Sequence, residues 1–128
     1  MRGARVSSII LAVDDSNTMR QMVAHVLRQG GYEVLEAADA EAALELARAQ
    51  PVHAVLTDHN LPGMDGIALV RALRAVPEHA RTPIVVLTTE RSEELRQAGR
   101  EAGATGWMVK PFDPERLLEV FGRVLATA

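Results

Sequence analysis

Four short apolar runs of this chain each end in a polar residue that suits phosphate or metal chemistry. The runs and the residues that follow them are Ile9–Val13 with Asp14 and Asp15, Val52–Thr57 with Asp58, Ile84–Leu87 with Thr88, and Trp107–Val109 with Lys110. Apolar runs of this length, separated by amphipathic stretches, favour buried parallel strands. Because ligands of an open parallel sheet bind outside the carboxyl ends of its strands, we expect three carboxylates, a hydroxyl and an ammonium to meet at one edge.

The three aspartates predict a divalent cation. Carboxylates that are brought together repel and raise one another's pKa unless a cation joins them. Mg²⁺ takes oxygen ligands, keeps several waters and is typically held by one or two carboxylates with a phosphate. Asp58 is also suited to attack a phosphoryl group and form an aspartyl phosphate. The alternative for all three is a capping role, Asp14 and Asp15 at a helix start and Asp58 in the turn that follows it.

Lys110 is the only lysine in the chain, and it precedes Pro111. A compact ammonium suits a single contact to a phosphate or carboxylate, where a planar guanidinium would be bulkier. The alternatives are a surface lysine here and an ordinary strand threonine at position 88.

Amphipathic stretches between the apolar runs predict helices, so that the chain forms five strand–helix units and a parallel sheet covered on both faces. A further short strand is expected at Tyr32–Ala37, and residues 75–83 form the longest connection. The first helix starts at a cap on Ser16 or Asp15 and ends at Gly30, the second ends at Pro51, the fourth starts at Ser92, and the fifth starts at Asp113. The expected core-facing positions of the five helices are Met19, Met22, Val23, Val26 and Leu27; Ala40, Ala43, Leu44 and Ala47; Gly66, Leu69, Val70 and Leu73; Leu95, Ala98, Gly99 and Ala102; and Leu117, Val120, Phe121, Val124 and Leu125.

Composition sets the outer bounds. The 128 residues suit one domain, residues 1–128 with a core of about 8–125, and 48% hydrophobic with 24% charged residues is typical of a globular chain. A net charge of −3 gives no footprint for nucleic acid, and the absence of cysteine excludes disulfides and thiolate sites. No stretch approaches the ~20 apolar residues of a membrane span. We therefore expect a cytoplasmic protein without a nucleic-acid or membrane partner.

Taken together, the motifs resemble the receiver domain of two-component response regulators, closest to the single-domain CheY-type chemotaxis regulators. The matching segments are Val13–Arg20, Asp58–Gly66, Leu87–Glu90 and Ala104–Phe112, and the resemblance covers essentially the whole chain. It implies a flavodoxin-like, doubly wound α/β fold with strand order 2-1-3-4-5.

The resemblance also implies a role for each site residue. Asp58 would be the phosphoacceptor, and Mg²⁺ would be bound by Asp14, Asp15, Asp58 and the backbone carbonyl of Asn60. Lys110 would contact the phosphoryl oxygens, Thr88 would hydrogen-bond one of them, and Trp107 would stand at the position of an aromatic switch. Pro111 would follow a cis peptide bond, which costs little before proline.

Other residues have plainer interpretations. Trp107 also fits a buried strand tryptophan, and the four histidines (His25, His53, His59 and His79) are isolated and are interpreted as solvated or hydrogen-bonded. Arg91, Arg96 and Arg100 are interpreted as a solvated face of the fourth helix.

The function implied by the resemblance is signalling and not dedicated catalysis. A histidine kinase would be the phosphodonor, and a flagellar motor switch protein would bind the face made by the fourth helix, fifth strand and fifth helix of a monomeric regulator. The open alternative is a receiver with another output: a phosphorelay shuttle, a phosphate sink or a non-chemotaxis regulator. A transcription factor would need a DNA-binding domain after the fifth helix. An aspartyl-phosphate phosphatase is remote, because such enzymes place an acid two residues after the nucleophile, where this chain has Asn60.

Overall fold

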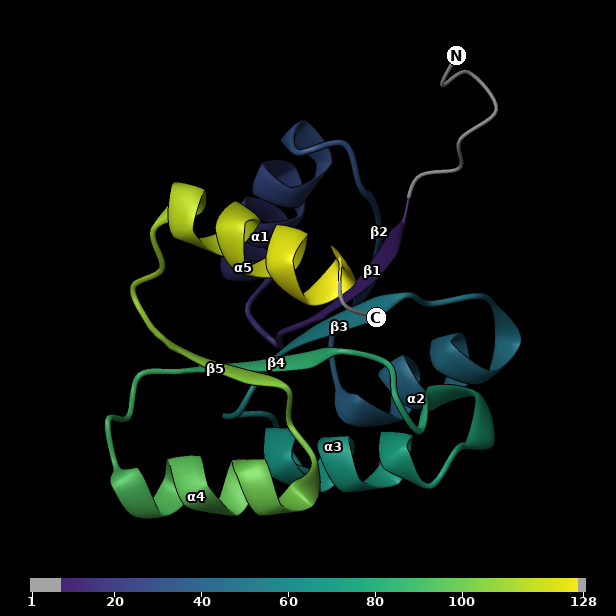
Figure 1. Ribbon diagram of the computed structural model, residues 1–128, viewed down its shortest axis with the longest axis vertical. Coiled ribbons are helices and arrows are strands. Elements are labelled where there is room, and N and C mark those ends of the chain that lie inside the picture. The colour runs from purple at the N-terminus through teal and green to yellow at the C-terminus, as the bar shows by residue number, and fades with distance from the viewer. Residues whose placement is uncertain (1–7, 127–128) are drawn as a thin grey trace.

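A computed structural model describes residues 8–126 and contains one sheet of five parallel strands in the order β2-β1-β3-β4-β5. The elements in chain order are β1 (Ile9–Val13), α1 (Asn17–Gln29), β2 (Glu33–Ala37), α2 (Ala40–Ala49), β3 (Ala54–Asp58), α3 (Gly66–Arg74), η1 (Pro77–His79), β4 (Ile84–Thr88), α4 (Glu93–Ala102), β5 (Gly106–Val109) and α5 (Pro114–Ala126). Helices α1 and α5 cover one face of the sheet, and α2, α3 and α4 cover the other (Figure 1). The doubly wound fold predicted from the sequence is therefore confirmed. The predicted domain limits include residues 1–7 and 127–128, which lie outside the described residues.

The apolar runs are continuous because the central strands are buried on both faces. Every residue of β3 and β4 is buried. Since successive strand residues point to opposite faces, each strand contributes to two cores. One core packs α1 and α5 on the sheet around Leu27 and Phe121. The other packs α2 and α3 around Leu44 and Leu69.

Short polar side chains start the helices where the sequence predicts them. The Ser16 hydroxyl accepts a hydrogen bond from the Met19 N–H at 3.2 Å, so Ser16 and not Asp15 caps α1. Ser92 caps α4 in the same way, through the Leu95 N–H at 3.2 Å. Such caps satisfy backbone donors that have no partner inside the helix. Because Ser16 accepts the hydrogen bond from Met19, neither the Asp14 nor the Asp15 carboxylate serves as the cap of α1.

The predicted core position of Met22 is wrong, since this residue is 50% exposed. The buried residues of α1 are Val23, Ala24 and Leu27. With 3.6 residues per turn, the middle of that buried arc lies about 150° around the helix from Met22. Because Ala24 belongs to the buried side of α1, that side is centred away from Met22, and Met22 faces solvent.

The long connection at 75–83 contains a 3₁₀ turn, η1, that the sequence did not reveal. His79 at its end is buried, with Nε2 at 2.8 Å from the Ala47 carbonyl and Nδ1 at 2.8 Å from the Thr82 hydroxyl.

Arg74, the last residue of α3, ties three segments together at the end of the sheet where β4 and β5 begin. Its Nε and Nη2 donate to the Gly103 carbonyl at 3.1 and 2.8 Å, and its Nη1 donates to the carbonyls of His79 and Thr82. Burial lowers the pKa of this guanidinium. Gly103 caps the end of α4 with φ at 112°, a conformation that glycine adopts without strain. The C-terminal end of α4 is therefore fixed to α3.

Candidate phosphoacceptor and metal site

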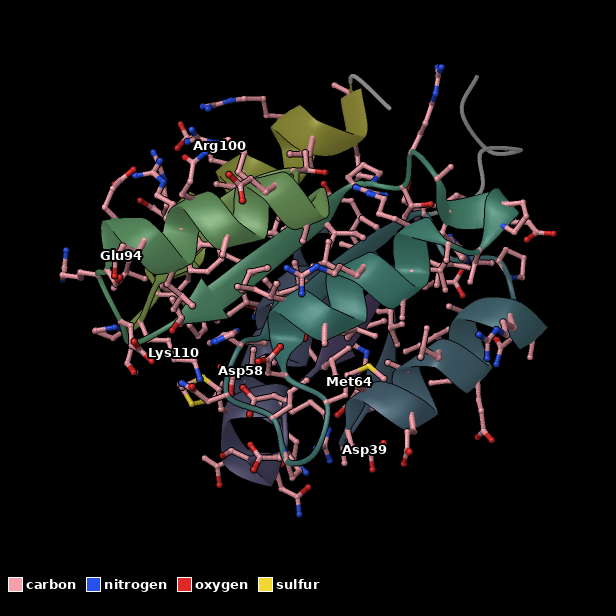
Figure 2. All side chains as sticks on the ribbon, turned by 90° about the horizontal axis from the view of Figure 1, so that it is seen from below. Asp39, Asp58, Met64, Glu94, Arg100 and Lys110 are labelled. Atoms are coloured by element: carbon pink, nitrogen blue, oxygen red, sulfur yellow. The ribbon has the colours of Figure 1, made fainter. Side chains whose placement is uncertain are left out.

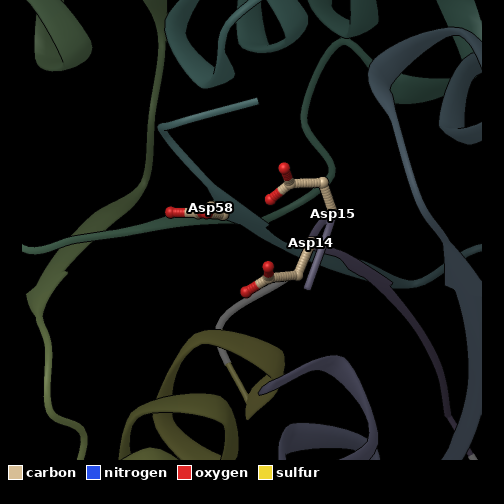
Figure 3. A group of neighbouring side chains, drawn as sticks. All are labelled: Asp14, Asp15 and Asp58. Atoms are coloured by element: carbon tan, nitrogen blue, oxygen red, sulfur yellow. The ribbon is translucent and has the colours of Figure 1, made fainter. Parts of the chain in front are cut away.

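Strand register brings the three aspartates together. Val13 of β1 pairs with Thr57 of β3. The residues that follow them in the sequence, Asp14 and Asp58, therefore lie at the same edge of the sheet. One carboxylate oxygen from each of Asp14, Asp15 and Asp58 lies within 4.8 Å of the others. Figure 3 shows the three carboxylates, from two strand ends, directed towards the same region. Asp14 and Asp58 are buried and Asp15 is exposed, so the cluster is open to solvent on one side.

Lys110 reaches this cluster from the end of β5. Its Nζ lies 3.2 Å from Asp58 Oδ1 and 3.6 Å from Asp14 Oδ2. The side chains of Asp58 and Lys110 meet beyond the strand ends in Figure 2. The Lys110 backbone N–H donates to the Thr88 carbonyl at 2.7 Å, which extends the pairing of β4 with β5 to this residue. The peptide bond between Lys110 and Pro111 is cis, the isomer that the resemblance implied.

The Asp14 carboxyl has a raised pKa, mainly because it is buried. The negative charges of Asp58 and Asp15 raise this pKa further, and the Ser16 N–H and the Lys110 ammonium lower it. The Ser16 N–H donates to Asp14 Oδ1 at 2.9 Å. One ammonium thus faces three carboxylates, an excess of negative charge that favours binding of a further cation.

The donor set fits Mg²⁺. Asp58 Oδ1 is buried and has no hydrogen-bond partner, and its contact with Lys110 is an ion pair without hydrogen-bond geometry. A buried oxygen of this kind is costly unless a ligand satisfies it. All donors are oxygens, the ligand type that Mg²⁺ prefers. Asn60, the fourth expected contributor, is exposed in the loop after β3.

Thr88 and Trp107 lie on the neighbouring strands β4 and β5, where Thr88 pairs with Val109 at the strand end and Trp107 pairs with Val86, two residues earlier. Thr88 is fully buried, and its hydroxyl accepts a hydrogen bond from the Glu90 N–H at 3.1 Å. Trp107 is half-buried against α4, where a Cβ atom placed on Gly99 would lie 2.4 Å from the indole Cζ3. The missing side chain at Gly99 therefore makes the space that the indole occupies.

The interpretation of His59 as solvated or hydrogen-bonded fails for its Nδ1, which is buried and has no hydrogen-bond partner. Only 8% of the residue is exposed, its Nδ1 has no partner, and its ring centre lies 6.4 Å from that of Trp107. The His59 side chain, which directly follows Asp58 in the sequence, therefore lies beside the indole of Trp107. By contrast His25 and His53 are exposed, as are Arg91, Arg96 and Arg100.

Sequence reasoning also missed Arg20 and Gly99 as parts of the site's surroundings. Gly99 was assigned only to the core stripe of its helix, although a glycine inside a helix signals a close approach by a neighbour. Arg20 is one arginine among many in the sequence, and only the pairing of β1 with β2 gives it a carboxylate partner, Glu36, at 3.1 Å.

Comparison with known proteins gives consistent matches. A family model for the response regulator receiver domain matches residues 10–121. The chemotaxis protein CheY4 of Vibrio cholerae is similar in structure, with a TM-score of 0.90 and 47% identity over 93% of this chain and 99% of that one. The receiver domain of the sensor histidine kinase PA1611 from Pseudomonas aeruginosa PAO1, which holds a magnesium ion in its active site cleft, has a TM-score of 0.87 and 30% identity over 94% of this chain and 99% of that one.

Among curated proteins, the transcriptional regulatory protein SrrA of Staphylococcus aureus is 38% identical over 113 residues, which make up 88% of this chain and 46% of that protein. The chain thus spans about half the length of the curated relatives it matches. None of the helices in residues 8–126 combines the length and apolar character needed to cross a bilayer.

Proposed function

This chain belongs to the response regulator receiver domain family, and on that premise we propose that Asp58 accepts a phosphoryl group from a histidine kinase with the help of Mg²⁺. The observation that carries the proposal is the buried Asp58 Oδ1, which lacks a hydrogen-bond partner and lies 3.2 Å from the Lys110 ammonium. One carboxylate oxygen of Asp14 and one of Asp15 lie within 4.8 Å of a carboxylate oxygen of Asp58. A nucleophile beside a fixed cation and a cation-binding acidic pair is the arrangement that phosphoryl transfer needs.

In the proposed transfer, an oxygen of the Asp58 carboxylate attacks phosphorus. The P–N bond of the kinase's phosphohistidine breaks, and its electron pair leaves with the imidazole. Lys110 stabilises the phosphoryl oxygens through its charge, and Thr88 donates its hydroxyl to one of them once the new bond has formed. Asp14, Asp15, Asp58 and the Asn60 carbonyl would hold Mg²⁺, which when bound would supply positive charge against the charge on the transferring group.

Acetyl phosphate with Mg²⁺ tests the assignment without a kinase. We expect the intact mass to increase by one phosphoryl group, which alkali removes. Asp58→Asn should take up none, because an amide does not attack phosphorus here. Asp39→Asn is the matched control, since Asp39 caps α2 away from the site and asparagine caps equally well (Figure 2). Phosphoryl uptake by the Asp58 variant, or uptake on a histidine, would remove Asp58 from this role.

For the output we propose a chemotaxis role in which the phosphorylated chain binds a flagellar motor switch protein. The support is the 47% identity to CheY4 over nearly the whole of that chain. The face formed by α4, β5 and α5 also carries a hollow of about 90 Å³ lined by Arg96, Arg100 and Trp107. Phosphorylation then acts by shifting the population of this face between two states, and the chain works as a signalling module and not as a dedicated enzyme.

The similarity to SrrA, a transcriptional regulatory protein about twice as long as the aligned region, favours a second output, which is the regulation of transcription. In that case, or in a phosphorelay shuttle or a phosphate sink, the switch protein is not the target. Affinity for a switch-protein fragment and for a kinase fragment, measured with and without acetyl phosphate, separates these outputs. We expect roughly a tenfold gain for the switch protein, about 1.4 kcal/mol. Phosphoryl exchange with the kinase without any such gain would overturn the motor role and keep the receiver.

A further inference from the structure

The Arg20 guanidinium joins three elements next to the acidic site. Arg20 lies on α1, and its side chain is only 13% exposed. Nη1 donates to the Asp14 carbonyl at 2.7 Å, Nε donates to Glu36 on β2 at 3.1 Å, and Nη2 donates to the Asn17 side chain at 2.6 Å. The end of β1 is thereby fixed to β2 and to the first turn of α1.

The Asp14 carbonyl that Arg20 holds belongs to the peptide group between Asp14 and Asp15. The orientation of this planar group sets the direction in which both side chains leave the backbone. The Asp14 N–H, on the other side of the residue, donates to the Ala37 carbonyl at 3.1 Å. Asp14 is thus held at both of its peptide groups, and Arg20 supplies the hold on the side of Asp15.

Arg20 differs from Lys110 in what it contacts. Lys110 lies within 3.6 Å of carboxylate oxygens of Asp14 and Asp58. Arg20 contacts a backbone oxygen of Asp14 and, together with Asp14 and Asp58, lines a small cavity of about 10 Å³ behind the site. Its contact with Asp14 therefore leaves the carboxylate oxygens available to a cation.

We propose that Arg20 is a positioning residue that orients the Asp14 and Asp15 carboxylates for divalent-cation binding. This inference rests on the proposed function, in which these two carboxylates bind Mg²⁺. Outer partners of metal ligands typically contribute 10–100-fold to metal affinity or activity. Since Arg20 acts through the backbone and the ligands themselves are kept, we place its effect at the lower end, about tenfold.

Arg20→Met keeps the apolar stem and removes every donor, and Arg28→Met is its matched control. Arg28 contacts the same Glu36 at 3.4 Å, and it also donates a hydrogen bond to the Val34 carbonyl at 3.1 Å. We expect the Mg²⁺ dissociation constant, measured by NMR titration, to rise about tenfold in Arg20→Met and less than twofold in Arg28→Met. At saturating Mg²⁺, phosphorylation of Arg20→Met by acetyl phosphate should return to near the wild-type rate. Equal affinities in the two variants would overturn the inference.

A readout without metal separates this inference from the proposed function. In metal-free protein, Arg20→Met should speed hydrogen exchange of the Asp14 and Ser16 amides, which donate to Ala37 and to the Asp14 carboxylate. Unchanged exchange at both amides would contradict the positioning role. A wild-type chain that binds no Mg²⁺ would instead contradict the metal site of the proposed function, and the exchange data would still decide the role of Arg20.

Glu36→Gln covers the case in which Arg20→Met fails to fold. It removes the charge that holds Nε and preserves the shape of the side chain. We expect its Mg²⁺ affinity to fall about threefold. If both variants fold, the double variant should bind no more weakly than Arg20→Met alone, because both changes release the same guanidinium. Unchanged affinity in Glu36→Gln, or fully additive losses, would refute the proposal.

Discussion

Replacing Gly99 by alanine sets helix propensity against the packing of Trp107. In the interior of an exposed helix, alanine is favoured over glycine by about 1 kcal/mol. At this position, however, the new methyl group would lie 2.4 Å from Cζ3 and 3.0 Å from Cε3 of Trp107. The indole is a rigid ring, so it must rotate away from α4.

The cost of that rotation exceeds the gain in propensity. A tryptophan buries 150–250 Å², and exposing roughly 100 Å² of it costs about 2.5 kcal/mol at 25 cal/mol per Å². Subtracting the gain of about 1 kcal/mol leaves Gly99→Ala less stable than the wild type by about 1.5 kcal/mol. Trp107 emission should also shift to the red, because the ring enters water.

Gly122 provides a matched control within α5. A Cβ atom placed there meets nothing within 4 Å, so Gly122→Ala should stabilise the chain by about 1 kcal/mol through propensity alone. Urea unfolding of the two variants, followed by far-UV circular dichroism, should therefore differ by about 2.5 kcal/mol in the free energy of unfolding. If Gly99→Ala is stabilised as much as Gly122→Ala, with unchanged Trp107 emission, the packing argument is refuted.

Three other results are expected. Because burial raises the pKa of Asp14 in the folded chain, the contribution of this carboxyl to the stability of the metal-free protein should be lost as the pH rises through its unfolded-state pKa and then its higher folded one, so the free energy of unfolding of the wild type relative to Asp14→Asn should fall with rising pH in urea titrations between pH 3 and 8. Arg74→Met should lower the free energy of unfolding by about 3 kcal/mol, since it leaves the partly buried carbonyls of Gly103, His79 and Thr82 without these donors; a loss below ~1 kcal/mol would contradict the idea that Arg74 holds these three segments together. Lys110→Arg and Thr88→Ala should still accept phosphoryl from acetyl phosphate but lose the gain in affinity for the partner, and a full gain in both would refute their role in the switch.

The fold was predictable because the signals for it are local. Both faces of the central strands are buried, so the sequences of β3 and β4 are mainly apolar. Ser16 and Ser92 mark helix starts through hydrogen bonds to residues only three positions further along the chain. The meeting of Asp14, Asp58 and Lys110 beyond the strand ends was predictable for a related reason. In a parallel sheet, residues that end neighbouring strands share an edge whatever the loops do.

What sequence reasoning missed depends on contacts between distant segments. His59 and Trp107 are 48 positions apart, and their ring centres come within 6.4 Å because β3, which precedes His59, and β5, which carries Trp107, both pair with β4. The fit of Trp107 against Gly99 joins a helix to the following strand at a distance that no periodicity encodes. The exposure of Met22 depends on how α1 is rotated about its axis, a quantity that Ala24 decides and that an apolar pattern averages over.

Because Arg74 holds the C-terminal end of α4, the helix can act as a rigid arm that turns about that end. The helix is tied at Gly103 by the Arg74 guanidinium, and Gly99 is the only buried residue along its ten positions. At a rise of 1.5 Å per residue, Gly99, which Trp107 contacts, lies about 6 Å along the helix axis from Gly103, and Glu93 lies about 15 Å from Gly103. If the indole of Trp107 displaces Gly99, the start of α4 would therefore move about two and a half times as far as Gly99 does. Glu94, in the first turn of α4, lies towards the end of the molecule that carries Asp58 and Lys110, and Arg100 lies further along the helix (Figure 2). The size of this amplification depends on where the contacted glycine lies along α4. Moving that glycine one turn towards Ser92 would reduce the displacement of the start of α4 for the same movement of the Trp107 ring.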